Sequence, residues 1–474
     1  MTSGPPDSLV VRNIDVLVTM DDDRRVLTNA WILVRGNVIE ALGNANNKPP
    51  DAAHTIDATG KIVIPGLINT HHHFFQSLLR AVPSLQNRSL WYWLLELYRP
   101  MASLTDEMND VSTRLVIAEL LLSGCTTAQD HSYVFVNDMA FETQINAASE
   151  MGMRFHLSRG SITVGRADGS IAEDDLVEDE EKVLAHCEHL AKSFHDPTPG
   201  AMTRIDLAPV SLFSNSPWLL QESAALARKL DLGLHTHCYE SQEEEDYCLE
   251  VHGARPVQFA ADNGWTGPDV WFAHAVRHDT QEVKLMGLTG TGVAHCPSSN
   301  MRLASGIAPV KEYLEQGVRV GLGCDGSASN DSSHLLAEAR TAMLLQRVKH
   351  GANAMTATQA LELGTLGGAK VLRRDDIGML APRKVADFVA FDLNQPSFAG
   401  ALHDPVAALI FCQPSRVDLS VINGKVVVDD GQILGLDLRA LVDHHNLLAG
   451  QLIEATEARF GHDLSTKVWH QAWR

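Results

Sequence analysis

The sequence lacks the features that mark secreted, membrane-spanning and disulfide-bonded proteins. Its seven cysteines are scattered and contain no C-x-x-C pair, which argues against a disulfide framework and against a cysteine zinc site. No uninterrupted apolar run reaches ~18 residues, and the opening MTSGPPDSLVVRN has neither the basic nor the apolar region of an export signal. We therefore expect a protein of the reducing cytoplasm that is neither exported nor bound to a membrane.

Positive charge is also scarce. The chain has 38 Lys and Arg against 59 Asp and Glu, a net charge of −21. A field of that sign repels phosphate backbones and anionic lipid surfaces, so we expect no nucleic acid and no membrane as partner. Hydrophobic residues make up 45% and charged residues 20%, as in globular proteins. The length of 474 residues fits a barrel of about 250 residues with a smaller domain attached.

Both ends of the chain have the texture of β-strands. Apolar and polar residues alternate in short runs, separated by Gly, Asn and Asp, at 9–20, 30–43, 54–66, 386–393 and 417–433. Asn423-Gly424 lies between two β-branched runs and is a strong hairpin signal. We expect residues 1–60 and 376–440 to build one small β-sandwich together, followed by a C-terminal helical tail over 441–474.

Between these ends, short apolar strands alternate with helix-like stretches such as PWLLQESAALARKL (217–230), a pattern that predicts repeated βα units. Eight candidate strands can be counted: 61–69, 124–131, 153–160, 204–210, 232–237, 270–275, 290–296 and 318–325. Eight such units indicate an α/β fold, a (β/α)8 TIM-like barrel over 61–375. Its functional groups should lie at the carboxyl ends of the strands.

Polar side chains stand at those strand ends. The first candidate strand runs into three histidines, and residues i and i+2 of a strand share a face, so His71 and His73 can point together while His72 points away. Two imidazoles suit a metal such as Zn²⁺, but a catalytic site normally has three or more protein ligands. His237, which ends the fifth strand, and Asp325, which ends the eighth, are the candidates for the rest.

Further titratable groups follow the same edge. Glu240 lies three residues after His237 and could shuttle protons at a metal-bound water whose pKa is lowered toward ~7. His274 ends the sixth strand and could orient that water or polarise a substrate. Any single histidine of this kind can be an ordinary buried polar residue instead. The roles of His235, His131 and His295 stay open.

Four segments carry a resemblance to a known family: PGLINTHHH, HTHCYE, AHCPSSNMRLASGIAPV and DGSASND. They resemble the aminohydrolase branch of the amidohydrolase superfamily, over nearly the whole chain. The resemblance implies one divalent ion, Zn²⁺ or else Fe²⁺, on His71, His73, His237 and Asp325. The fourth candidate strand, RIDLAPV, does not end in the lysine of binuclear relatives.

The resemblance also implies a reaction. Asp325 would take a proton from the attacking water, Glu240 would protonate a ring nitrogen, and His274 would steady the nucleophile, so that an amino group beside a ring nitrogen is replaced by oxo with release of ammonia. In detail the motifs look most like those of 8-oxoguanine deaminases, which yield urate, followed by isoxanthopterin, isocytosine, guanine and hydroxytriazine aminohydrolases. Such relatives are often homo-oligomers.

Several residues bear on the identity of the ring. Gln76 completes H-x-H-x-x-Q and could read a substrate's amide-like edge with its paired donor and acceptor. Arg159, at the end of the third strand, could donate hydrogen bonds to a ring oxygen of the substrate, or it could form a structural ion pair. Trp91, Tyr92 and Trp93 are aromatic candidates for stacking, although a helical core stripe explains them equally well.

Two other functions remain open on the sequence. Some close relatives in the family cleave chloride or alkylamine from triazines with the same metal site. A third possibility is a non-catalytic metal-binding or ligand-binding protein that kept the barrel, although no catalytic position is missing. The acidic insert at 166–181 and the dipeptide Cys238-Tyr239 depart from the family pattern and leave the substrate undecided.

Overall fold

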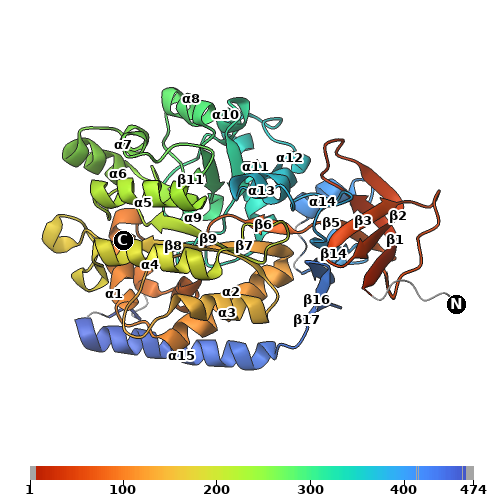
Figure 1. Cartoon of the computed structure of the whole chain (residues 1–474), viewed down its shortest axis with the longest axis horizontal. Coiled ribbons are helices and arrows are strands. Elements are labelled where there is room, and N and C mark those ends of the chain that lie inside the picture. Colours follow the sequence, from red (N-terminus) through yellow and green to blue (C-terminus); the bar gives the residue numbers. More distant parts are fainter. Residues whose placement is uncertain (1–6, 413, 415, 462, 466–474) are drawn as a thin grey trace, which may run out of the picture.

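The computed structural model describes residues 7–412, 414, 416–461 and 463–465, and it contains a closed barrel beside a separate sheet (Figure 1). Eight parallel strands close the barrel: β6 (Leu67–Asn69), β7 (Cys125–Ser132), β8 (Arg154–Ser161), β9 (Thr203–Pro209), β10 (Gly233–Cys238), β11 (Val270–His274), β12 (Gly292–His295) and β13 (Arg319–Leu322). β13 pairs with β6 and completes the ring. The predicted (β/α)8 architecture is confirmed.

The second sheet combines the two ends of the chain. From the N-terminal side come β1 (Ser8–Val18), β2 (Val26–Arg35), β3 (Val38–Gly43), β4 (His54–Asp57) and β5 (Lys61–Pro65). From the C-terminal side come β14 (Phe388–Asp392), β15 (Leu419–Ile422), β16 (Lys425–Asp429) and β17 (Gln432–Ile433). β5 pairs with β14, so the two halves share one sheet with an apolar core of its own. Asn423 and Gly424 turn β15 into antiparallel β16, as predicted.

One predicted barrel strand is divided between the two sheets. The apolar run 61–69 was expected to be the first strand of the barrel, but Lys61–Pro65 pairs with β14 in the second sheet and only Leu67–Asn69 enters the barrel. Gly66 separates the two segments, and its amide donates to the Asp387 carbonyl. The barrel therefore begins after Gly66 and not at residue 61. The other seven predicted strands lie where expected, with shifted ends.

Helices cover the outside of the barrel and cross its mouth. They are α1 (Leu90–Met101), α2 (Asp106–Ser123), α3 (Phe141–Glu150), α4 (Glu180–Phe194), α5 (Pro217–Leu230), α6 (Gln242–Tyr247), α7 (Pro256–Asp262), α8 (Thr280–Thr289), α9 (Pro297–Arg302), α10 (Val310–Glu315), α11 (Leu335–His350), α12 (Ala357–Glu362), α13 (Gly368–Val371), α14 (Pro405–Phe411) and α15 (Leu438–Phe460). A 3₁₀ helix, η1 (Phe74–Leu79), follows the three histidines.

The long helix α15 runs along the side of the barrel beside α2 and α1 (Figure 1). The helical tail was expected over 441–474. The structure begins this helix at Leu438 and ends it at Phe460, and residues 466–474 lie outside the described residues. Thr105 begins α2 because its side chain accepts a hydrogen bond from the Met108 amide, and Asp437 begins α15 in the same way.

The barrel and the sheet meet at buried ion pairs. Arg154, at the start of β8, is fully buried and binds both carboxylate oxygens of Asp387 at 2.8 and 3.0 Å. Arg374 binds both oxygens of Asp376 at 2.7 Å. These contacts lie at the amino ends of the barrel strands, opposite the predicted site.

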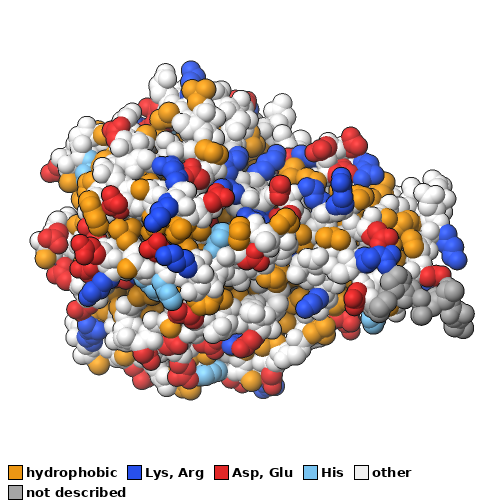
Figure 2. Space-filling view, viewed as in Figure 1, with side chains coloured by type: hydrophobic (Ala, Val, Ile, Leu, Met, Phe, Trp, Pro, Cys, Tyr) orange, Lys and Arg blue, Asp and Glu red, His pale blue; other side chains and the backbone are white. Residues whose placement is uncertain are grey.

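On the face shown in Figure 2, acidic and basic side chains are interspersed, and Lys and Arg do not gather into a continuous area. Among the described residues, no helix has the length and apolar character needed to cross a membrane.

Candidate metal centre and substrate cavity

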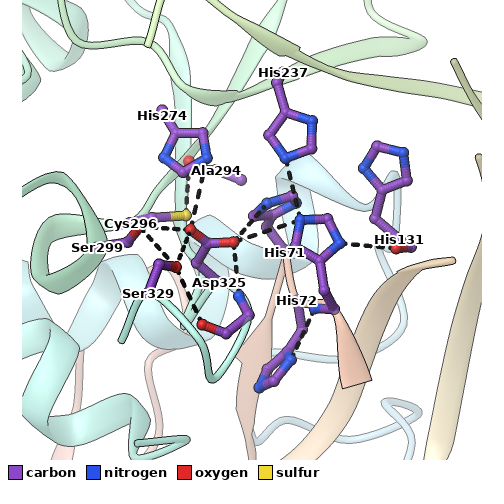
Figure 3. A network of polar contacts seen from close by, with 12 residues as sticks. His71, His72, His131, His237, His274, Ala294, Cys296, Ser299, Asp325 and Ser329 are labelled. Atoms are coloured by element: carbon purple, nitrogen blue, oxygen red, sulfur yellow. Dashed lines mark hydrogen bonds and ion pairs between the residues drawn. The ribbon is translucent and has the colours of Figure 1, made fainter. Parts of the chain in front are cut away.

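The four predicted ligands converge at the carboxyl ends of the barrel strands, and Figure 3 labels His71, His237 and Asp325 among them. His71 and His73 follow β6, His237 is on β10 and Asp325 follows β13. The Oδ1 atom of Asp325 lies 3.3 Å from His71 Nε2 and 3.5 Å from His73 Nε2. The Nε2 atoms of His73 and His237 are 3.1 Å apart. His72 points away from this centre and contacts the Ser333 hydroxyl at 3.0 Å.

Hydrogen bonds fix the tautomer of each histidine. His73 Nδ1 faces the His131 carbonyl at 2.8 Å and His237 Nδ1 faces the Val210 carbonyl at 2.5 Å. A carbonyl only accepts, so both Nδ1 atoms carry the proton. His71 is held through another imidazole: His235 donates from Nδ1 to the Trp271 carbonyl at 3.0 Å, so its Nε2 accepts from His71 Nδ1 at 2.8 Å.

All three Nε2 atoms are therefore left with lone pairs directed at one another and at a carboxylate. His71 Nε2 is buried and has no hydrogen-bond partner among the described residues. Burial lowers the pKa of His237 to about 3 and lowers the pKa of His71 and His73, which keeps the rings neutral. Four acceptors cannot satisfy each other without a cation. The donor types fit a borderline divalent metal such as zinc. Two groups have ligand atoms within 4.8 Å of one another, namely His71, His73, His131 and His237, and His71, His237, His274 and Asp325, so the predicted ligands are divided between two overlapping groups.

Asp325 is held in place by donors of its own. Ser299 and Ser329 donate to its Oδ2 at 2.5 and 2.9 Å, and the Gly326 amide donates to Oδ1 at 2.6 Å. Burial raises the pKa of Asp325, but the contact with His71 and the other nearby histidines outweigh burial and hold this pKa well below its usual range. The carboxylate is thus ionised and available as a ligand and as a proton acceptor.

Glu240 and His274 complete the polar side of the site. His274 Nδ1 contacts the Asn300 side-chain oxygen at 2.9 Å, so it is the donor, and Nε2 is 3.5 Å from Glu240 Oε2 and 3.8 Å from Asp325 Oδ2. Burial, reinforced by the charges of Asp325 and Glu244, raises the pKa of Glu240 well above its usual range. The raised pKa favours the protonated form that a general acid needs.

A cavity with about 470 Å³ of space between atoms, part of it open to solvent, adjoins these groups. Apolar and aromatic side chains line it together with a few polar ones: His73, Gln76, Leu90, Trp93, Leu94, Tyr98, Tyr133, Val210, Ser211, Phe213, His237, Glu240, Glu244, His274, Leu303 and Asp325. None of the described residues in this lining is Lys or Arg. The cavity can hold a flat, uncharged ring beside the candidate metal centre.

The three aromatic candidates of α1 separate clearly. Trp93 is buried, lines the cavity and has an Nε1 donor without a partner among the described residues. Trp91 packs on Phe213 with ring centroids 5.4 Å apart, and Tyr92 is 59% exposed. Gln76 also lines the cavity: its Nε2 donates to the Tyr133 hydroxyl at 3.4 Å, and its Oε1 has no partner among those residues.

Arg159 does not reach the cavity. It binds both carboxylate oxygens of Glu178 at 2.6 and 2.9 Å, and its guanidinium lies 4.4 Å from the centre of the Phe135 ring. Glu178 belongs to the acidic insert that precedes α4, so the structure uses Arg159 to fasten this insert to the barrel. The sequence allowed either a substrate contact or a structural ion pair, and the structure places Arg159 in the ion pair.

The remaining strand-end histidines form a second layer. His235 orients His71, as described above. His131 stacks on His237 with centroids 5.0 Å apart and donates from Nε2 to the Ala208 carbonyl at 2.7 Å. His295 is buried and neither of its ring nitrogens has a partner among the described residues. His235 contacts a predicted ligand through its ring, at His71 Nδ1, and His131 contacts one through its backbone carbonyl, at His73 Nδ1.

The backbone is unusual where the functional side chains stand. Tyr239, His274 and Asp325 have φ values of 58°, 69° and 63° although none of them is glycine. This left-handed conformation is costly for such residues and is found where the surrounding structure enforces it, often at functional sites. Arg255 helps to enforce it, since it donates to the Tyr239 hydroxyl at 2.5 Å and to Glu282.

Sequence reasoning missed several members of the site. Ser299, Asn300 and Ser329 fix Asp325 and His274, and their signal was available in CPSSN and DGSASN, the segments that carried the family resemblance. Glu244 was also missed, because Glu240 precedes α6 and only the fold shows that Glu244, on α6, accepts from the Glu240 amide. Trp93 could not be told from its neighbours because a run of three aromatics shows no single inward face.

Comparison with known proteins agrees with this geometry. Residues 62–427 match the amidohydrolase family. The chain is 44% identical to the 8-oxoguanine deaminase of Pseudomonas aeruginosa over 88% of this chain and 93% of that protein. It is 36% identical to an isoxanthopterin deaminase from an unknown prokaryotic organism, over 92% and 95%. The crystal structure of zinc-complexed atrazine chlorohydrolase from Arthrobacter aurescens TC1 superposes with a TM-score of 0.90, at 33% identity, over 93% and 100%.

Proposed function

The chain belongs to the amidohydrolase family and is a hydrolase that acts on C–N bonds. From that premise we propose that it deaminates an amino-substituted nitrogen heterocycle, and that the substrate is 8-oxoguanine, which water converts to urate and ammonia. The observation that carries this proposal is the convergence of His71, His73, His237 and Asp325 beside the buried Glu240, whose pKa is raised.

His71, His73 and His237 would hold one divalent ion through their free Nε2 atoms, and Asp325 through its carboxylate. Zinc is the ion we propose, because the donors are three imidazoles and a carboxylate and because the atrazine chlorohydrolase structure contains zinc; Fe²⁺ is the alternative. Such an ion supplies Lewis acidity, which lowers the pKa of a water molecule toward ~7.

The side chains of this protein handle the protons. Asp325 is ionised and accepts a proton from the attacking water. Glu240 starts protonated and donates to the ring nitrogen next to the carbon under attack, so that negative charge does not build up on the ring. His274, held by Asn300 and aimed between Glu240 and Asp325, orients the water. The proton taken up by Asp325 then leaves with the amino group as ammonia.

Gln76 reads the opposite edge of the ring. It follows β6, whereas Glu240 follows β10, four strands away around an eight-stranded barrel, so the two face each other across the mouth. The free Oε1 of Gln76 can accept from an N–H, and its Nε2 can donate to a neighbouring carbonyl. The amide-like N1–H and O6 edge of 8-oxoguanine presents that pair. Trp93 Nε1 is the unpartnered donor for the second ring oxygen.

The cavity favours an uncharged base over a nucleotide. Lys and Arg are absent from its described lining, so a phosphate or carboxylate would lack a counter-charge there. Isoxanthopterin, guanine and isocytosine are alternative substrates of the same chemistry.

A second reaction is favoured by a specific observation. The atrazine chlorohydrolase fold covers 93% of this chain, and a triazine is also a flat, uncharged nitrogen heterocycle. Cleavage of chloride or alkylamine from a triazine is therefore the competing proposal. We further propose a reducing cytoplasmic location, in keeping with seven unpaired cysteines, and a homo-oligomeric state.

The test is product release by purified, zinc-loaded protein. Ammonia should be released from 8-oxoguanine faster than from isoxanthopterin, isocytosine, guanine, cytosine or hydroxyatrazine. Chloride and alkylamine should be measured in parallel with atrazine-type substrates. Metal-loaded protein that releases no ammonia from any of these rings would refute the deaminase proposal, and release of chloride or alkylamine would establish the competing one.

A further inference from the structure

A second buried carboxyl group lies in the cavity beside the general acid. Glu244 is 1% exposed and lines the cavity. Its Oε2 accepts a hydrogen bond from the Glu240 amide at 2.8 Å, while its Oε1 is buried and has no partner among the described residues. Glu245, the next residue, instead faces Arg255. Glu244 therefore carries a free oxygen that the protein itself leaves unsatisfied.

An unpaired buried carboxyl oxygen is costly, so a ligand that satisfies it is strongly preferred over one that does not. The described cavity lining offers no Lys or Arg to do so. We infer that the partner comes from the substrate, and the donors of a free nitrogen base are its N–H groups. Burial raises the pKa of Glu244 to about 7, so part of the protein carries the ionised form near neutral pH, and the free oxygen of that form accepts from an N–H group.

The position of Glu244 identifies the N–H group. Glu240 and Glu244 are joined by a hydrogen bond and lie on the same side of the mouth, opposite Gln76. In the orientation proposed above, Gln76 takes the N1–H and O6 edge of the ring, so Glu240 faces N3. In a purine, N3 and N9 lie on the same edge with one carbon between them. The N–H group next to Glu244 is thus N9–H.

Resting on the proposed function, we propose that Glu244 is a specificity-determining residue that accepts the N9–H of 8-oxoguanine and so requires a free, unsubstituted base. Isoxanthopterin carries an N–H at the corresponding position of its second ring, whereas a nucleoside carries a sugar there. The contact also explains how a fold shared by nucleoside and base deaminases can select the base.

The test compares substrates methylated at either nitrogen of the five-membered ring. With wild-type protein, 9-methyl-8-oxoguanine should be turned over at least ~10²-fold less efficiently than 8-oxoguanine, because the methyl group removes the donor and meets the carboxyl group. In Glu244→Ala this ratio should fall to within ~10-fold. Glu244→Gln should lose ~10²-fold on 8-oxoguanine, since its amide keeps the bond to Glu240 and turns NH₂ toward N9–H.

Two controls separate recognition from general damage. Asp246→Asn removes a charge from the exposed side of α6 and should behave as wild type on every substrate. The response to 7-methyl-8-oxoguanine should be the same in wild type and in the Glu244 variants, because that methyl group lies away from Glu244. Zinc content and the unfolding midpoint are measured on each variant.

The outcomes are distinct. Wild-type protein that deaminates none of the bases refutes the proposed function. Wild-type protein that deaminates 8-oxoguanine but accepts the 9-methyl compound equally well overturns the role of Glu244 without any variant, even where the variants do not fold. The same conclusion follows if Glu244→Ala keeps the wild-type ratio between the two substrates.

Discussion

At the scale of single residues, the candidate metal site depends on ligand atoms whose lone pairs point at one another. It also depends on the hydrogen-bond partners that orient these ligands. His235 has this second role: it fixes the proton of His71 on Nδ1 and leaves Nε2 free. Partners of this kind raise the basicity of a ligand and fix its orientation, and their loss typically costs 10–100-fold in metal affinity.

We expect His235→Phe to weaken zinc binding by about 10–100-fold, because His71 then loses the acceptor for its Nδ1 proton. His235→Gln should lose less, since an amide oxygen can take over the acceptor role. Competition with a chelator of known zinc affinity measures both. Equal affinity in wild type and His235→Phe would show that the hydrogen bond does not support the metal.

Glu240→Gln should retain zinc and slow turnover by about 10²-fold or more, because an amide cannot deliver the proton to the ring nitrogen. His73→Ala and Asp325→Ala should lose zinc and activity together. Metal analysis beside steady-state kinetics distinguishes the two classes. A Glu240→Gln protein with the full rate would show that another group donates the proton.

The ligands could be predicted at this scale because their spacing and their place at strand ends carry the information. His71 and His73 form an i, i+2 pair, and His237 and Asp325 end other barrel strands. Arg159 could not be assigned, because its partner Glu178 lies in an insert whose path no local pattern fixes. Glu244 needed the cavity to be seen, since only burial shows that its free oxygen is unsatisfied.

At the scale of elements, two short segments form one wall of the site. The turn after β13 approaches η1 so closely that a Cβ atom on Gly326 would overlap the side-chain amide of Gln76. Gly326, the residue after Asp325, therefore leaves the space that the Gln76 side chain occupies.

Gly326→Ala should displace the Gln76 amide and raise KM for 8-oxoguanine about 10-fold, with zinc content unchanged. The reason is that the added methyl group occupies the place of the Gln76 side chain, while the backbone of residue 326 needs no left-handed conformation. Steady-state kinetics with metal analysis is the measurement. Unchanged KM would mean that Gln76 does not contact the substrate.

The helix α15 is fastened to η1 by one buried contact, between His445 Nε2 and the Ser77 hydroxyl at 3.0 Å. Burial lowers the pKa of His445 to about 4. A lowered pKa in the folded state means that the stability it contributes is present above the unfolded value of ~6.5 and is lost as the pH falls toward 4.

Between pH 7.5 and 5, His445 should therefore account for a loss of about 2 kcal/mol in the free energy of unfolding. His445→Gln removes the titrating group. Between pH 7.5 and 5, the free energy of unfolding of this variant should therefore fall by about 2 kcal/mol less than that of wild type. Asn446→Gln, a change without a titrating group at the exposed next residue of α15, is the control and should keep the wild-type pH dependence. Urea unfolding followed by circular dichroism checks the three proteins.

Element prediction succeeded where strand and helix alternate and failed where one apolar run serves two sheets. The stretch 217–230 is α5 with the bounds expected, because Ser216 caps it and Pro217 begins it. The run 61–69 gives no sign of its division, since Lys61–Pro65 and Leu67–Asn69 are equally apolar and only pairing with β14 separates them.

At the scale of the whole molecule, the buried ion pair between Arg154 and Asp387 joins the barrel to the sheet. Removing one partner of such a pair leaves a buried, uncompensated charge, which typically costs 3–5 kcal/mol, whereas removing both costs less. Arg154 also donates to the Gly200 and Ala201 carbonyls, so its loss affects the loop before β9 as well.

We expect Arg154→Met to lower the free energy of unfolding by about 3–5 kcal/mol because Asp387 is left unpaired. The double variant Arg154→Met/Asp387→Leu should recover part of this loss. Since the joint lies at the end of the barrel away from the cavity, kcat of the folded Arg154→Met protein should stay near wild type. Urea denaturation and kinetics test both parts, and an additive double variant would contradict the coupling.

The sharing of one sheet by the two ends of the chain also affects synthesis on the ribosome. β5 leaves the ribosome some three hundred residues before β14, its partner in the sheet. Until then β5 presents an unpaired edge, and such edges recruit other chains. Contacts so distant in sequence also slow folding. A nascent chain stalled before β14 should therefore be protease-sensitive at its N-terminal strands and dependent on chaperones, and the sheet should close only after β14 has been synthesised.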